Sequence, residues 1–159
     1  MNIVSHKQLH QKKERLNYRN MVAVCWGNRD AHSNEDKSCD AKRGSLKDIQ
    51  QSMKKINVFD GTTLSDIKYS SDGTIYSNDK DLDEDLNLRL NLNCEARRLK
   101  ECRLQALHAL HRSIAQKYFG KTAPQSYYQK LMEHYTAQQE MKTPYSGILI
   151  YWLNKHIRQ

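Results

Sequence analysis

Apolar residues recur every three or four positions between residues 94 and 119, a spacing that places them on one side of an α-helix. The pattern predicts the longest helix of the chain, from Cys94 to Phe119, with Asn93 as its N-cap and Gly120 just after its end. Its apolar positions are Ala96, Leu99, Cys102, Ala106, Leu107, Leu110, Ile114 and Tyr118. Cys94 and Cys102 lie about 12 Å apart on such a helix, so we expect them to pack in a core rather than share a metal ion.

Four shorter segments also have helical spacing. Residues 45–53 place Leu46, Ile49 and Met53 on one face, after Ser45 as a possible N-cap. Residues 82–92 predict a short amphipathic helix. Residues 124–142 predict a helix with a proline in its first turn, and residues 145–157 predict a last helix with basic residues in its final turn. The apolar positions of the last two are Tyr128, Leu131, Tyr135, Ile148, Leu149, Tyr151 and Trp152.

One segment has the pattern of a β-hairpin. The β-prone triplets 67–69 and 74–76 flank Ser-Ser-Asp-Gly, and Asp72-Gly73 accepts the positive φ of a tight turn. A hairpin alone is barely stable, so it is expected to pack against the long helix. The predicted fold class is therefore α+β and mostly helical. Residues 1–92 would form a first part with the hairpin and residues 93–159 a C-terminal helical region, together making one compact unit.

Composition narrows the classes of function. The chain has 159 residues and a formal net charge of +8, which favours acidic partners, nucleic acid among them, although a solubilising surface is an equal alternative. No segment has the roughly 20 apolar residues that a membrane span needs, and no secretory signal is recognisable at the beginning. We therefore expect a cytoplasmic protein with no membrane contact. Its four cysteines are expected to be thiols or metal ligands rather than disulfides.

The stretch Leu16–Gly44 gathers the residue types that build metal sites. Four apolar residues lead into Cys25, a polar loop of thirteen residues follows, and Cys39-Asp40 comes next. His6 and His10 lie a short way upstream. Cysteine and histidine are the usual ligands of zinc, and aspartate is a ligand of Mg²⁺ and Mn²⁺. A metal centre is therefore expected here.

The same stretch resembles a known family. Leu16–Cys25 (LNYRNMVAVC) and Cys39–Gly44 (CDAKRG) are similar to segments of the PtuB-like HNH endonucleases of the Septu and retron anti-phage defence systems. Later segments look like the family's further signature: Ile67–Tyr69, Asp72–Ser77 and Leu90–Cys94. The resemblance covers roughly residues 4 to 115. It implies a ββα-metal (HNH) segment, metal-dependent cleavage of DNA, and assembly with a partner ATPase.

The resemblance also implies roles for single residues. His6 would be the general base, Asn20 would orient it, and Asp40 would hold the catalytic Mg²⁺ or Mn²⁺. Cys25 and Cys39 would be two ligands of a structural zinc ion. The basic pair Lys42-Arg43 is the candidate for nucleic-acid contacts. Ordinary alternatives stay open: a histidine without a role, a turn asparagine, a carboxylate favoured by a helix N-terminus, and a cysteine that is a small buried hydrophobe.

Departures from the family pattern leave a second function open. The family's first Cys-x-x-Cys pair is missing, Ser5 stands in place of an acidic residue, and Ser38 replaces the histidine before Cys39. The chain would then be a truncated or catalytically inactive HNH derivative that acts as a binding or regulatory subunit. A DNA-binding module that acts by charge alone is a third possibility. The tyrosines of the C-terminal helices are expected to serve packing or partner docking rather than DNA contacts.

Overall fold

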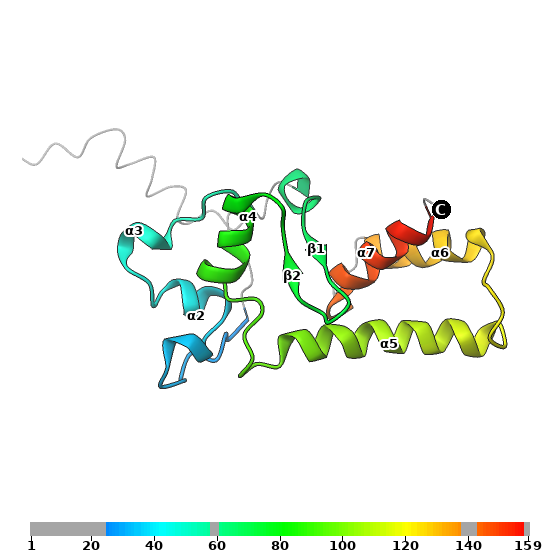
Figure 1. The fold of residues 1–159 in the computed structure, drawn as a ribbon, viewed down its shortest axis with the longest axis horizontal. Helices are drawn as coiled ribbons and strands as arrows, with labels where there is room; N and C mark the ends of the chain where they lie inside the picture. The colour runs from blue at the N-terminus through cyan, green and yellow to red at the C-terminus, as the bar shows by residue number, and fades with distance from the viewer. Residues whose placement is uncertain (1–24, 58–60, 138–142, 158–159) are drawn as a thin grey trace, which may run out of the picture.

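A single long helix, α5 (Leu99–Lys117), runs beneath a short β-hairpin and connects the two ends of the molecule (Figure 1). The computed structural model describes residues 25–57, 61–137 and 143–157. Near the beginning of α5 lie the short helices α2 (Cys39–Arg43), α3 (Asp48–Gln51) and α4 (Lys80–Glu84). Beside its other half lie α6 (Gln125–Thr136) and α7 (Ser146–Ile157). The prediction of a mostly helical α+β chain is confirmed, since its sheet consists of two antiparallel strands.

The hairpin follows its predicted pattern. Strands β1 (Lys68–Tyr69) and β2 (Ile75–Tyr76) pair antiparallel, with Tyr69 opposite Ile75. Gly73 has φ +81°, and its amide donates to the carbonyl of Ser70. A Cβ on this glycine would come within 2.4 Å of the Lys100 carbonyl oxygen, so the turn lies directly against α5. The predicted packing of the hairpin on the long helix is therefore confirmed.

The beginning of α5 differs from the prediction. The helix starts at Leu99, after Arg98 in the left-handed region at φ 50°, and Asn93 is not its cap. The side chain of Asn93 instead accepts the amide proton of Ile75 and donates to the Ile75 carbonyl. Asn93 therefore ties strand β2 in place, and this tertiary contact outweighs its local capping preference.

The end of α5 is close to the prediction. Phe119 takes the left-handed C′ position with φ 52°, and Gly120 follows with φ +75°. The Gly120 amide donates to the Ala115 carbonyl at 2.9 Å, the bond that closes a Schellman motif. Gly120 was predicted at C′ and lies one residue later, so a phenylalanine carries the left-handed backbone.

A core between α5, α6 and α7 forms the larger apolar cluster. Its buried members are Leu110, Ile114, Ala123, Tyr128, Ile148, Leu149 and Leu153. Partly buried tyrosines pack around them, with Tyr118 and Tyr127 rings 5.1 Å apart. These tyrosines thus serve packing, while Tyr145, just before α7, is 40% exposed. Helix α6 ends at Thr136, earlier than predicted, because Ala137 already has an extended ψ of 143°.

A second core lies under the hairpin and is built around a buried carboxylate. Ile75, Leu82 and Leu86 are its apolar members. Asp85 is fully buried, and its carboxylate accepts the backbone amides of Lys54, Lys55 and Ile56 at 2.7–3.0 Å. In place of the helix predicted over residues 82–92, α4 passes at Asp85 into a wider π-helical turn that ends at Arg89.

The helix predicted over residues 45–53 is the least accurate expectation. Only the four residues of α3 are helical, and Lys47 rather than Ser45 precedes them. Ile49 was expected to face a core, but it is 89% exposed. The Ser45 hydroxyl donates to the Lys42 carbonyl and so belongs to the end of α2.

Candidate metal centre

Cys25 and Cys39 lie side by side although thirteen residues separate them. Their sulfur atoms are 2.9 Å apart, and both thiols are free. Cys25 is exposed in the loop before a tight turn, while Cys39 is half-buried as the first residue of α2. The structure thus brings together the two cysteines for which the resemblance implies a shared zinc ion.

The backbone around the two thiols is closely packed. Gly27 has φ +66°, and a Cβ there would come within 2.2 Å of the Ser38 carbonyl oxygen. The Ser38 amide donates to the Gly27 carbonyl at 2.8 Å, and the Cys39 amide donates to Leu90 at 2.7 Å. Because only glycine fits this approach without strain, Gly27 allows the Cys25 segment to reach the beginning of α2.

The segment Leu90–Cys94 holds the loop between the cysteines from the other side. The amide of the Asn91 side chain donates to the carbonyls of Glu35 and Lys37, both at 2.8 Å. The buried Cys94 thiol points at the carbonyls of Glu35 and Asp36. The loop is therefore fixed by residues more than fifty positions further along the chain.

Arg97 brings a positive charge to the thiol pair. Its Nη1 donates to the Ser38 hydroxyl at 3.2 Å and lies 3.9 Å from the Cys25 sulfur. Burial raises the pKa of Cys25, but hydrogen bonds from Cys39 and Arg97 outweigh it and bring that pKa below its ordinary value. Burial, together with the neighbouring Cys25, raises the pKa of Cys39 to about 11. Cys25 is therefore the thiol that ionises first.

The three charged residues after Cys39 have partners within the chain. Asp40 forms an ion pair with Arg43 at 2.5 Å. Lys42 is only 4% exposed, and its ammonium group lies 2.9 Å from a Glu35 carboxylate oxygen. Asp40 and Arg43 are both half-buried. Of the candidate nucleic-acid contacts, Arg43 thus presents part of its side chain to solvent, and Lys42 is directed towards Glu35.

The described residues supply part of a metal shell. Structural zinc takes four ligands, and two thiolates in adjoining positions fit half of a tetrahedral set. Among residues 25–57, 61–137 and 143–157, no group of three or more His, Cys, Asp and Glu side chains is arranged to hold a metal ion. His6 and Asn20, to which the resemblance gives catalytic roles, lie outside the described residues.

Two polar residues that hold the cysteine loop, Asn91 and Arg97, were not predicted as part of the centre. The Asn91 side-chain amide donates to the carbonyls of Glu35 and Lys37, and the Arg97 guanidinium donates to the Ser38 hydroxyl. The alternation of asparagine with leucine over residues 90–93 was the available signal, since an asparagine between apolar residues commonly bonds neighbouring backbone. The pattern was used only as part of the resemblance and of a helix prediction.

Comparison of the chain with known protein families, with curated proteins and with solved structures finds no match. Within the described part of the chain, no helix combines the length and apolar character needed to cross a bilayer.

Proposed function

We propose that the chain is an HNH-type, metal-dependent DNA endonuclease subunit of a bacterial anti-phage defence complex. The observation that carries the proposal is the convergence of Cys25 and Cys39, whose sulfur atoms lie 2.9 Å apart. The proposal includes a cytoplasmic location and a partner ATPase, both taken from the resemblance to PtuB-like nucleases.

The packing of the segments behind the resemblance supports the proposal. Leu90–Cys94 bonds the cysteine loop through Asn91 and the Leu90 carbonyl, and it bonds strand β2 through Asn93. The backbone amide of Ser77, at the end of the hairpin segment, donates to the Asp83 carboxylate. Of the segments behind the resemblance, Leu90–Cys94 thus bonds both the loop between the cysteines and the hairpin, and this packing supports the proposal.

The chain's own residues would divide the work as follows. Cys25 and Cys39 would hold a structural zinc ion, which fixes the loop on α2. His6 would accept a proton from the attacking water, and Asn20 would orient His6. Asp40 would help to hold a catalytic Mg²⁺ or Mn²⁺, which supplies charge stabilisation for the phosphate when it is bound. For that role the Asp40 carboxylate must share or leave its ion pair with Arg43.

Cleavage of supercoiled plasmid by the purified chain tests the proposal. We expect nicking in the presence of Mg²⁺ or Mn²⁺, loss of nicking in His6→Ala and Asp40→Asn, and zinc in the purified sample. His134→Ala is the matched control, because it removes an exposed histidine of α6 that belongs neither to the catalytic set nor to the candidate metal centre. Nicking that persists in His6→Ala would contradict the assignment of the general base.

A second candidate function is a catalytically inactive HNH derivative that acts as a binding or regulatory subunit. The Asp40–Arg43 ion pair favours it, since this carboxylate is already neutralised by a cation of the same helix. A chain that contains zinc and nicks no plasmid with either metal, while binding a partner from its own operon, would support this second function over the first.

A further inference from the structure

Ion pairs are distributed unevenly along the chain. Among the described residues, the ion pairs all lie between Glu35 and Glu101. Several cations of that part have carboxylate partners, as Lys54 does with Asp81 and Glu84, whereas the exposed Lys47 and Lys80 belong to none of these pairs. The remaining pairs join Lys42 to Glu35, Arg43 to Asp40, Lys55 to Asp79, Arg89 to Glu84 and Asp85, and Arg98 to Glu101.

The other half of the molecule has several cations and few carboxylates. We call residues 102–137 and 143–157 the helical unit; they contain one acidic residue, Glu133. Its exposed cations are Arg112, Lys117, Lys121, Lys130 and Lys155. None of these five takes part in an ion pair with the described residues. The helical unit is therefore net positive, with six Lys and Arg residues against one Glu.

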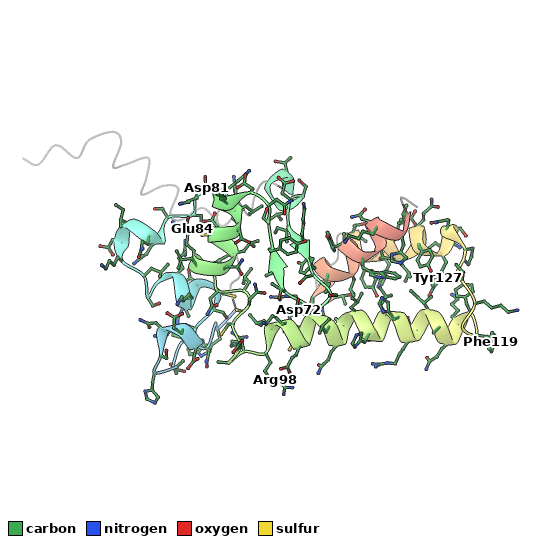
Figure 2. The ribbon with its side chains drawn as sticks, in the orientation of Figure 1. Asp72, Asp81, Glu84, Arg98, Phe119 and Tyr127 are labelled. Atoms are coloured by element: carbon green, nitrogen blue, oxygen red, sulfur yellow. The ribbon has the colours of Figure 1, made fainter. Side chains whose placement is uncertain are left out.

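An exposed aromatic ring lies between two of these cations in the sequence. Phe119 is 90% exposed at the turn between α5 and α6, and its ring points away from the helices (Figure 2). Lys117 and Lys121 flank it in sequence, and the Lys117 ammonium lies 4.2 Å from the centre of the Tyr127 ring. A solubilising surface mixes both signs of charge and avoids large exposed apolar side chains. This turn does neither.

Unpaired lysines beside an exposed ring suit nucleic acid. Cations that displace counterions from phosphates provide most of the sequence-independent affinity, and aromatic rings stack on unpaired bases. The cations extend over three helices, α5, α6 and α7, and an extended polyanion can contact such a spread more fully than a compact acidic patch can. We propose that the helical unit binds nucleic acid, with Lys117 and Lys121 on the phosphate backbone and Phe119 stacked on an unpaired base.

This inference deepens the proposed function, because it gives the DNA substrate a second contact surface away from the Cys25–Cys39 centre. It also moves the main nucleic-acid contacts from Lys42 and Arg43, which are paired with carboxylates, to cations that have none. Binding by the helical unit does not require cleavage, so the two proposals can fail separately.

Fluorescence anisotropy of the full chain with labelled single-stranded and duplex DNA tests the inference, at several salt concentrations and without added divalent metal. We expect the double variant Lys117→Gln/Lys121→Gln to bind about tenfold more weakly. The slope of log affinity against log salt should fall by about 1.5 to 2, since two phosphate contacts are lost. The matched control Lys47→Gln/Lys80→Gln removes two exposed lysines from the other half and should change affinity less than twofold.

The Phe119→Ser variant separates stacking from charge. It should weaken single-stranded binding about tenfold and leave duplex binding nearly unchanged, because only unpaired bases offer a free face. Three outcomes would each overturn the inference. The first is an equal loss of DNA affinity in the Lys47→Gln/Lys80→Gln control, and the second is unchanged affinity in Lys117→Gln/Lys121→Gln. The third is displacement of DNA by polyglutamate at equal charge concentration. DNA binding without nicking would keep it and reject the nuclease. Nicking by the chain, together with DNA binding that the Lys117→Gln/Lys121→Gln variant leaves unchanged, would keep the nuclease and reject the inference.

Discussion

The guanidinium of Arg97 lies 3.9 Å from the sulfur of Cys25, across 72 positions of sequence. It reaches the thiol from the turn that precedes α5, and it also holds the buried Ser38 hydroxyl next to Cys39. One side chain therefore links the cysteine loop to the beginning of the long helix. Charge-assisted hydrogen bonds to sulfur favour the thiolate form that zinc requires.

We expect Arg97→Met to weaken metal binding by about tenfold or more, the usual effect of losing a residue that orients metal ligands. Competition between the protein and a chromophoric zinc chelator measures the change, and the thiolate absorption of the Co²⁺-substituted chain reports ligand geometry. The neighbouring Arg98→Met is the control, since the Arg98 guanidinium pairs with Glu101. Equal zinc affinity in the two variants would show that Arg97 does not support the centre.

The two thiols should differ in reactivity. Cys25 is exposed with a lowered pKa, and Cys39 is half-buried with a pKa of about 11. Because the thiolate is the nucleophile, iodoacetamide at pH 7.5 should modify Cys25 several times faster than Cys39 in the metal-free chain. Peptide mass spectrometry over time measures both rates. Zinc should protect both residues together, and zinc that protects neither would argue against a shared metal ion.

Removal of the Asp85 charge should destabilise the fold. This carboxylate is fully buried and satisfies three backbone amides of the segment 54–56, which its neutral amide analogue cannot do. We expect Asp85→Asn to lower the free energy of unfolding by roughly 3 kcal/mol, the cost of unsatisfied buried donors and of a broken contact with Arg89. Urea unfolding followed by circular dichroism provides the measurement.

Asp81→Asn, on the same helix, is the comparison for Asp85. Its side chain is largely exposed and reaches only Lys54, so its loss should cost less than about 1 kcal/mol. Figure 2 shows Asp81 on the outer side of α4 together with Glu84. Similar losses in the two variants would mean that the amide cluster around Asp85 contributes little to stability.

Local patterns predicted the elements whose stability is local, and they failed where distant contacts decide. The hairpin follows from Asp72-Gly73, and the end of α5 follows from Gly120, because each glycine acts on its own turn. Asn93 was assigned to a helix cap, since a sequence does not show that its amide bonds Ile75. Ile49 was assigned to a core face that α3 is too short to form.

The candidate site divides in the same way. Cys25 and Cys39 were recognisable as a pair from residue type and resemblance. Arg97, which lies beside them, was not recognisable, because nothing local distinguishes it from the other arginines. Lys42 was chosen as a nucleic-acid contact for its charge, but its burial depends on Glu35 in the folded loop. Partners of charged residues are set by tertiary structure, and composition alone does not contain them.

Acid should weaken the packing of α5 on α7 through His111. Its ring lies 4.6 Å from that of Trp152, and its Nε2 is buried with no hydrogen-bond partner among the described residues. Burial lowers the pKa of His111 below 6.5, and the neighbouring His108 and His156 lower it further. The unfolded chain therefore binds this proton more readily than the folded chain. The contribution of neutral His111 to stability is complete above about pH 6.5 and is lost as the pH falls through the lower, folded-state pKa.

Thermal unfolding at pH 7.5 and at pH 5.5 measures this contribution. We expect the melting temperature to be lower at pH 5.5 than at pH 7.5. In His111→Gln, which has no titrating group at this position, the decrease in melting temperature should be smaller. His134→Gln is the matched control, because it removes an exposed histidine near the end of α6, and its acid shift should equal that of the unchanged chain. If the melting temperature of His111→Gln fell in acid as much as that of the unchanged chain, other groups would cause the effect. His156, whose ring stacks on that of Trp152 with centroids 3.6 Å apart, would then be the next residue to replace.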